Sequence, residues 1–299
     1  MKSWLLNWGF ITVFAFAGQN DTTLSFDTSE GTLISVDISP NGKTIAFDLL
    51  GHIYLMPSSG GEAEAITKGT SWNMLPRFSP DGEKILFTSD RSGSDDLWVQ
   101  NIKTGNMKNV SKMNIPVHQG TWSTDGKHVF GTALNMKVRH PVYRFNMYGK
   151  KQEIIPAGSR SPVNHFAMHP TNNLIYFSHG DGPLYRSGDR IKTYNIQNGE
   201  IKTYVDRAGG AANPTLSQDG KFLAYVHRDD RQTVLVVRNI QTNEEEIVNR
   251  NLDFDRMDGG SFYGSYTNMS WHPNNKEIFI SYDGGIHSVN VVTMKTKKI

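Results

Sequence analysis

The acidic segment 253–260 holds the residues whose types and spacing best suit a bound cation. Asp253, Asp255 and Asp258 place three carboxylates close together, and two glycines follow them. Calcium is held by several carboxylate and carbonyl oxygens on flexible loops of this kind. The spacing does not match an EF-hand, and no bidentate glutamate follows at the right distance. These aspartates are therefore weak calcium candidates, and a solvated acidic loop is the alternative.

Motifs that would give the chain its own catalysis are not found in the sequence. The stretch 158–162 approaches the Gly-x-Ser-x-Gly nucleophile elbow, but Pro162 stands where the last glycine should be. His165 and His169 are four residues apart, but their segment is expected to be a strand, so the helical spacing of a metal-binding pair does not apply. The chain has no cysteine, which excludes disulfides, zinc–thiolate sites and thiol nucleophiles. We predict no catalytic residue, no firm metal site and no cofactor.

A four-residue turn, repeated along the chain, indicates which elements would position a binding site. Ser79-Pro80-Asp81-Gly82 is the clearest copy, and the third residues of the copies are spaced by 40, 44, 46, 48 and 55 residues. Proline sets the first corner of such a turn, and glycine or asparagine accepts the positive φ that follows. The turns begin at Ser39, Ser79, Ser123, His169, Ser217 and His272.

The residues around each turn keep one register through all copies. Apolar residues that recur at period two are typical of strands that pack one face into a core. We predict an all-β fold, a six-bladed β-propeller of four-stranded antiparallel blades near 31–67, 72–111, 117–155, 161–205, 211–248 and 266–299. Three places before the third turn residue stand Ile38, Phe78, Trp122, Met168, Leu216 and Trp271. Four places after it stand Ile45, Ile85, Val129, Ile175, Leu223 and Ile278.

The main candidate binding site lies where the innermost strands are expected to begin. Six places before the third turn residue stand Ser35, Leu75, Gln119, His165, Asn213 and Asn268, of which only Leu75 is apolar. A ring of amides, imidazoles and a guanidinium at a channel mouth suits peptide or carboxylate recognition. The alternative is that these groups only cap strand ends and hold channel water. The candidates are Arg77, His118, Gln119, Asn164, His165, Asn213 and Asn268.

The second repeat carries a family signature. Its turn at 79–82, followed by Ile85–Gly93 and then Asp96-Leu97-Trp98, resembles the blades of TolB-like β-propellers, including that of the Tol-Pal system. Ile45–Tyr54 and Tyr225–Gln232 resemble, more narrowly, the N-terminal propeller of exported bacterial proteins that carry a metal-dependent amidohydrolase domain. No residue here matches the amidohydrolase metal motif, so none of that chemistry is carried over.

The N-terminal residues have the pattern of a secretion signal. Lys2 precedes a mostly apolar run from Trp4 to Ala17, which ends in the small-x-small sequence Ala15-Phe16-Ala17. We predict a signal peptide over 1–17, a propeller domain over 18–299, and a periplasmic or otherwise exported protein without membrane insertion after signal removal. An internal hydrophobic strand is the alternative. The formal net charge of +2 is too small for nucleic-acid binding.

The expected function follows from the resemblance and from the missing catalytic motifs. We expect a non-catalytic exported propeller that binds a protein or peptide partner of the cell envelope at its channel mouth. One alternative is an N-terminal substrate-gating or scaffold module of a larger metal-dependent amidohydrolase-type hydrolase. Another is an enzyme or lyase that uses the channel.

The two ends of the chain compete for one place in the predicted ring. Leu24–Thr28 alternates like a strand and could complete the last blade, as could the C-terminal residues Thr293–Ile299. One strand is then surplus. We therefore expect the chain to belong, or once to have belonged, to a longer protein.

Overall fold

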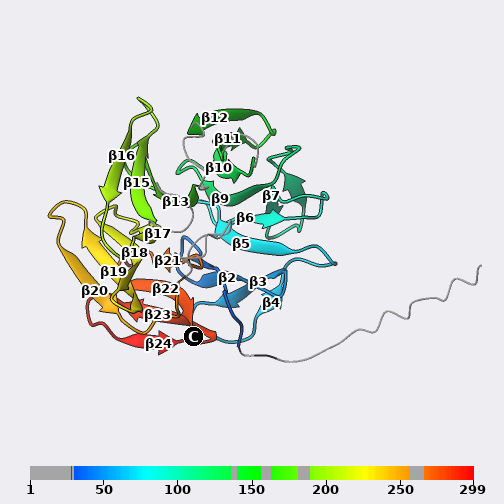
Figure 1. The fold of residues 1–299 in the computed structure, drawn as a ribbon. Helices are drawn as coiled ribbons and strands as arrows, with labels where there is room; N and C mark the ends of the chain where they lie inside the picture. Colours follow the sequence, from blue (N-terminus) through cyan, green and yellow to red (C-terminus); the bar gives the residue numbers. More distant parts are fainter. Residues whose placement is uncertain (1–27, 29, 136–139, 156–162, 181–188, 256–265) are drawn as a thin grey trace, which may run out of the picture.

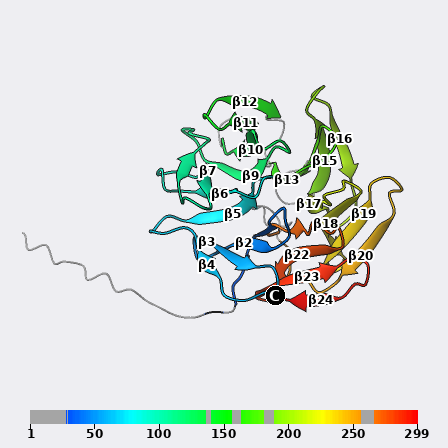
Figure 2. The same ribbon diagram turned by 180° about the vertical axis from the view of Figure 1, so that it is seen from behind.

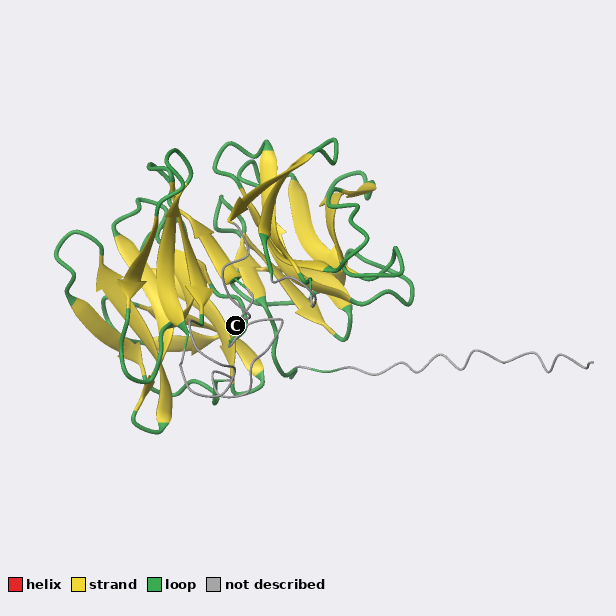
Figure 3. Ribbon diagram, turned by 45° about the horizontal axis from the view of Figure 1, so that its top comes forward, coloured by secondary structure: helices red, strands yellow, loops and turns green. Residues whose placement is uncertain are grey.

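The protein is a ring of six four-stranded antiparallel sheets, as Figure 1 shows. The computed structural model describes residues 28, 30–135, 140–155, 163–180, 189–255 and 266–299. The described residues form strands, turns and loops without a helix (Figure 3), which confirms the predicted fold. No membrane-crossing helix occurs in this part of the chain.

Each blade is built from four consecutive strands that pair in chain order, from the ring centre to the rim. Blade 1 consists of β1 (Val36–Ile38), β2 (Thr44–Leu49), β3 (His52–Pro57) and β4 (Glu64–Ala65). Blade 2 consists of β5 (Asn73–Phe78), β6 (Lys84–Ser89), β7 (Asp96–Asn101) and β8 (Met107–Asn109). Blade 3 consists of β9 (Val117–Trp122), β10 (His128–Ala133), β11 (Val142–Asn146) and β12 (Lys151–Ile155).

The second half of the ring repeats this arrangement. Blade 4 consists of β13 (Asn164–Met168), β14 (Leu174–His179), β15 (Arg190–Asn195) and β16 (Ile201–Val205). Blade 5 consists of β17 (Ala212–Leu216), β18 (Phe222–Asp229), β19 (Gln232–Asn239) and β20 (Glu245–Asn249). Blade 6 consists of β21 (Ser270–Trp271), β22 (Glu277–Tyr282), β23 (Gly285–Asn290) and β24 (Thr296–Lys298).

The repeated turns lie at one end of the ring, which we call the turn end. In four blades the turn serine accepts a backbone N–H five residues later, as Ser79 Oγ does from Lys84 at 2.9 Å. In blades 4 and 6 a histidine takes this place, and its Nδ1 accepts a turn N–H instead, from Asn274 at 3.1 Å in the case of His272. Asn275 has the expected positive φ of 56°. The same expectation for Asn172 is wrong, because that described residue is not among those with positive φ, and its N–H is bonded to His169 Nδ1 at 3.3 Å.

The core lies between neighbouring blades, and the residues three places before the third turn residue help to build it. Trp122 of blade 3 packs among Leu86, Val99 and Val129, and its indole N–H donates to Arg77 O of blade 2 at 3.2 Å. Trp271 of blade 6 repeats this bond to blade 5, with Thr215 O at 3.2 Å. Burial of these rings and the cross-blade bonds hold adjacent sheets together.

Blade 6 closes the ring onto blade 1 with side-chain packing and a few hydrogen bonds. Val36 N donates to Asn268 O at 3.2 Å, and His272 Nε2 lies 3.3 Å from Gly42 O. The C-terminus lies between blades 6 and 1 in both Figures 1 and 2, where Ile299 approaches Gly60. The outermost strand of blade 6 is the chain's own C-terminal β24. Residues 24–27 of the competing N-terminal segment lie outside the described residues.

Candidate functional site

The other end of the ring, which we call the channel end, is where the inner strands begin, at Ser35, Leu75, Gln119, His165, Asn213 and Asn268. Leu75, Gln119, His165 and Asn213 have φ of 59°, 59°, 51° and 56°, in the left-handed region. A non-glycine residue in this region costs about 1–2 kcal/mol. Strain of this kind persists only where the surrounding structure enforces it, and it gathers at functional sites.

A bulge in the inner strand accounts for this backbone in blades 2 to 5. The pairing register shifts at Leu75, Gln119, His165 and Asn213, so that two residues of the inner strand face one residue of its neighbour. The N–H of the strained residue is then free to bond the preceding blade. Leu75 N donates to Asp48 Oδ2 at 2.7 Å, and Asn213 N donates to Ser178 Oγ at 2.8 Å. The bulges therefore join blades along the channel.

Three predicted site residues converge on the segment 266–269, which leads into β21 near the centre of the ring in Figure 1. His165 Nε2 lies 2.9 Å from Tyr266 O, and the Asn213 amide donates to Thr267 O. Arg77 Nη1 donates to Met269 O at 3.5 Å. Side chains from blades 4, 5 and 2 thus hold the entry to blade 6. These three side chains satisfy backbone carbonyl groups of that segment.

The remaining candidates are also buried, and several polar atoms near the channel have no protein partner. His118, Gln119, Asn164 and Asn268 are each less than a tenth exposed. Among the described residues, no hydrogen-bond partner reaches Arg77 Nε, Asn164 Oδ1, His165 Nδ1 or Asn268 Oδ1. Buried polar atoms are nearly always hydrogen-bonded, so these atoms need partners beyond the described residues.

The charges at this site are largely compensated. Arg77 lies 3.5 Å from Asp37, whose carboxylate also accepts Phe78 N–H at 2.7 Å. Burial raises the pKa of Asp37, and the nearby Arg77 opposes that rise. Burial, with the Arg77 charge as a further cause, lowers the pKa of His165 to about 3, and burial with His140 nearby lowers that of His118 to about 4. Both imidazoles are neutral at pH 7, so the site offers neutral donors and acceptors beside one ion pair.

Asp48 belongs to this site and was missed in the sequence. Its two carboxylate oxygens accept Ser35 N and Leu75 N, each at 2.7 Å, and so connect blades 1 and 2. Burial raises the pKa of Asp48 to about 6. The sequence holds one sign of this role, a polar residue near the end of the otherwise apolar second strand of a repeat. Most other repeats also have a polar residue at this position, namely Thr88, Thr132, Ser178 and Ser281.

Two of the weak calcium candidates, Asp253 and Asp255, accept hydrogen bonds from other groups of the chain. Asp255 accepts a hydrogen bond from Thr233 Oγ1 at 2.9 Å and two more from Nε and Nη2 of Arg228. Asp253 accepts Asp283 N through both oxygens at 3.1 Å, and Asp258 lies outside the described residues. Within the described ranges, no group of three or more histidine, aspartate or glutamate side chains is arranged to hold a metal.

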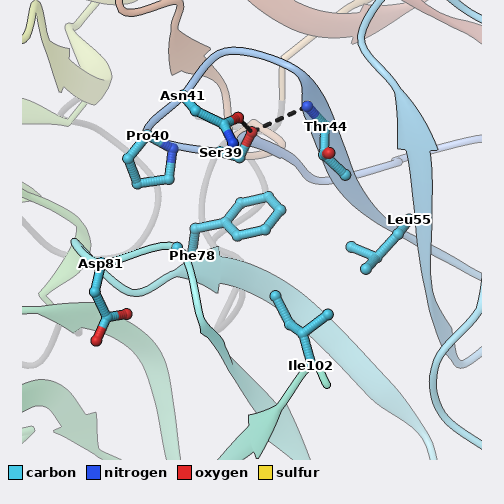
Figure 4. A pocket seen from close by; sticks show the side chains of 9 residues that line it. Ser39, Pro40, Asn41, Thr44, Leu55, Phe78, Asp81 and Ile102 are labelled. Atoms are coloured by element: carbon cyan, nitrogen blue, oxygen red, sulfur yellow. Dashed lines mark hydrogen bonds between the residues drawn. The ribbon is translucent and has the colours of Figure 1, made fainter.

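A cavity of about 400 Å³ lies at the turn end, away from the predicted mouth (Figure 4). It separates the first turn of blade 1 from blade 2. Figure 4 shows the Phe78 ring between that turn and Ile102. The lining residues are Ser39, Pro40, Asn41, Thr44, Leu55, Phe78, Asp81, Gly82 and Ile102.

Comparison with known proteins places this architecture among described propellers. A family model for the TolB beta propeller domain matches residues 11–186. The chain is 24% identical over 186 residues to the Tol-Pal system protein TolB of Francisella tularensis subsp. mediasiatica, covering 60% of this chain and 41% of that protein. It is 23% identical over 175 residues to the uncharacterized peptidase YuxL of Bacillus subtilis, covering 58% of this chain but only 24% of the peptidase.

A solved structure agrees in fold. TolB from Acinetobacter baumannii superposes with a TM-score of 0.66 at 18% identity, covering 88% of this chain and 62% of that one. The chain thus spans less than half the length of these two sequence relatives and about three fifths of this structure.

Proposed function

Because the chain belongs to the family of TolB β-propeller domains, we propose that it is a non-catalytic scaffold that binds a protein or peptide partner at its channel mouth. One observation carries the proposal. Strained backbone at Leu75, Gln119, His165 and Asn213 occurs at the same end of the ring as buried polar atoms that have no hydrogen-bond partner among the described residues. The same strained backbone recurs in four blades, and strain of this kind is characteristic of functional sites.

The chemistry of the site favours a peptide over an isolated anion. Arg77 is paired with Asp37, and His118 and His165 are neutral at pH 7. Among the described residues of the site, a free carboxylate would therefore find no uncompensated cation, whereas peptide N–H groups could donate to Asn164 Oδ1 and to His165 Nδ1, since His165 already donates to Tyr266 O through Nε2. The likeness to TolB proteins supports a partner in the cell envelope.

Capture from a cell-envelope extract tests the proposal. The immobilised chain should retain a defined protein, and Asn164→Ala with Asn268→Ala should reduce capture about ten-fold, because central buried contacts dominate binding. Tyr148→Ala is the matched control, since Tyr148 is 88% exposed on a turn outside the channel. Equal capture by the double variant and wild type, both with wild-type melting temperatures, would refute the channel mouth as the binding site.

Export is part of the same proposal. The predicted signal over 1–17 lies outside the described residues, and the likeness to Tol-Pal proteins supports a periplasmic location. Periplasmic fractionation followed by N-terminal sequencing should yield a chain that begins at Gly18. Recovery of uncleaved protein only from the cytoplasm would contradict it.

A second candidate function is the propeller module of a larger hydrolase. The observation that favours it is that the chain matches a quarter or less of a peptidase such as YuxL. The amidohydrolase association stays part of this second proposal. Hydrolysis by the purified 299-residue chain is expected in neither case. A reading frame that continues past Ile299 into a His-x-His metal motif would favour the module.

A further inference from the structure

The cavity at the turn end lies at a blade junction that is filled differently elsewhere in the ring. Leu55, Phe78 and Ile102 form its apolar wall and belong to one hydrophobic cluster. Ser39, Asn41 and Asp81 line its polar side. Figure 4 shows Ser39 and Asn41 on the turn above the Phe78 ring, with Asp81 to one side of it and its carboxylate directed away from the ring.

The junction between blades 5 and 6 provides the direct comparison, because its residues stand at the same register positions. Leu55 pairs with Ala46 as Val237 pairs with Ala224, and Trp271 stands where Phe78 does, three places before the third turn residue. Trp271, Val237 and Val291 again form one cluster. Apolar residues at equivalent positions therefore form the walls of both junctions.

The two junctions differ in how many aromatic rings fill them. The second residue after the turn of blade 5 is Phe222, and its ring stacks on Trp271 with centroids 6.2 Å apart and planes at 24°. The corresponding residue of blade 1 is Thr44, which lines the cavity. Blades 1 and 2 thus contribute one phenyl ring where blades 5 and 6 contribute a phenyl and an indole. Both side chains of the first pair, Thr44 and Phe78, are smaller than their counterparts, so the junction between blades 1 and 2 leaves space beside the Phe78 ring.

We propose that this cavity binds an aromatic side chain of a partner peptide, stacked on Phe78 as Phe222 stacks on Trp271. Stacking adds to the burial of apolar surface in such a pair. The carboxylate of Asp81 is 52% exposed at the rim, and Asn41 is exposed beside it. Asn41 Oδ1 and Asp81 Oδ1 each accept two hydrogen bonds within their own turns, and within the described ranges Asp81 Oδ2 is bonded to Lys84 Nζ alone. A carboxylate oxygen can accept a second hydrogen bond, so Asp81 Oδ2 suits an N–H group of an extended peptide. The site lies at the turn end and is independent of the channel mouth.

Peptide titration of the purified chain tests the proposal. The probes are the acetylated, amidated peptide Gly-Ser-Trp-Ser-Gly, the same peptide with leucine in place of tryptophan, and indole alone. Isothermal titration should show the tryptophan peptide binding about ten-fold more tightly than the leucine peptide. Thr44→Phe supplies the ring that blade 5 has, so it should weaken tryptophan-peptide binding at least about ten-fold without lowering the melting temperature.

Two further variants complete the design. His128→Phe introduces a phenylalanine at the register position of blade 3 that corresponds to Thr44. This position lies outside the cavity, so the variant should leave the affinity unchanged. Phe78→Leu keeps an apolar wall without the ring, so it should abolish the preference for tryptophan over leucine, which tests the site even if Thr44→Phe misfolds.

Four results would overturn the proposal, and the first three concern the peptides. These are no saturable binding of the tryptophan peptide, equal affinities for the two peptides, or an unchanged affinity in folded Thr44→Phe. Indole that binds as tightly as the peptide would assign the cavity to a free small aromatic molecule, against the proposal. Asn164→Ala acts at the channel end and should not affect this titration, so the two binding proposals fail separately.

Discussion

The two ends of the propeller stabilise the same six repeats by different means. At the turn end, Ser79 Oγ accepts a backbone N–H only five residues away, and the serines of three other turns do the same. At the channel end, Asp48 bonds Leu75 across 27 residues, and His165 bonds Tyr266 across 101. Local bonds can form in any copy of the motif, so their residues repeat. The long-range bonds each join different blades, so their residues differ.

The turn end is not stabilised by local bonds alone, because turns of neighbouring blades also touch. Gly82 approaches Pro40 of the preceding blade, and Gly126 approaches Pro80 in the same way. Where the second turn residue is proline, the next blade has glycine in the fourth place, and where it is threonine or glutamine, the next blade has asparagine. The proline–glycine pairs are Pro40 with Gly82, Pro80 with Gly126, Pro170 with Gly220 and Pro273 with Gly42, and the others are Thr124 with Asn172 and Gln218 with Asn275.

The largest expected effect is at the channel end. Arg77→Met removes the partner of buried Asp37 and the bond to Met269 O, so it should lower the free energy of unfolding by about 3 kcal/mol. Urea denaturation measures it. Asp37→Asn with Arg77→Met should recover part of the loss, because no unpaired charge then remains. If Arg77→Met lowered the free energy of unfolding by less than the replacement of a turn serine does, the two ends would not differ in this way.

A smaller effect is expected where turns of two blades touch. Gly220 has φ of +70°, and an added Cβ would lie 2.7 Å from His169 Cε1. Gly220→Ala should therefore cost about 2 kcal/mol from backbone strain and crowding. Gly105→Ala is the control, because Gly105 has φ of +71° but no atom within 4 Å of the added Cβ, and it should lose only the strain part. Equal losses in thermal melting would show that the contact between turns is unimportant.

The pH dependence of stability should come from the channel end. The folded pKa of Asp48, about 6, lies above its ordinary value of 3.8, so the native state binds this proton more tightly than the unfolded chain. The resulting stabilisation is fully present below pH 3.8 and is lost as the pH rises through 6. Because Asp48 is partly exposed, we expect about 1.5 kcal/mol across this window. The free energy of unfolding, measured by denaturation and plotted against pH, should have a different slope in this window for wild type and for Asp48→Asn. Parallel curves for the two proteins would contradict the assignment.

The smallest effect is expected for a single local bond at the turn end. Ser79→Ala removes the acceptor of Lys84 N–H and should cost about 1 kcal/mol. Ser217→Ala removes the equivalent bond to Phe222 and should cost the same in urea denaturation. A difference above about 1 kcal/mol between these variants would show that turn-end stability depends on the neighbouring blades as well.

The sequence by itself determined the repeat, the number of blades and the chemistry of the turns. Period-two apolar residues and turn residues such as Asp81-Gly82 act over a few positions, so their structural effect can be read locally. The expectation failed at Asn172, whose N–H is bonded to the His169 ring, whereas the N–H of Asn275 is bonded to the backbone oxygen of His272 and that residue keeps the left-handed backbone. The likeness to TolB-like blades was carried by the same local motifs.

Only the tertiary structure decided which polar groups meet and where space remains. The bulges at Leu75, Gln119, His165 and Asn213 depend on donors and acceptors from neighbouring blades, and no local pattern encodes them. Asp48 looked like an ordinary strand residue until folding placed it between two inner strands. The cavity at the turn end likewise arises because Thr44 and Phe78 come from different blades, so its size depends on how two sheets pack.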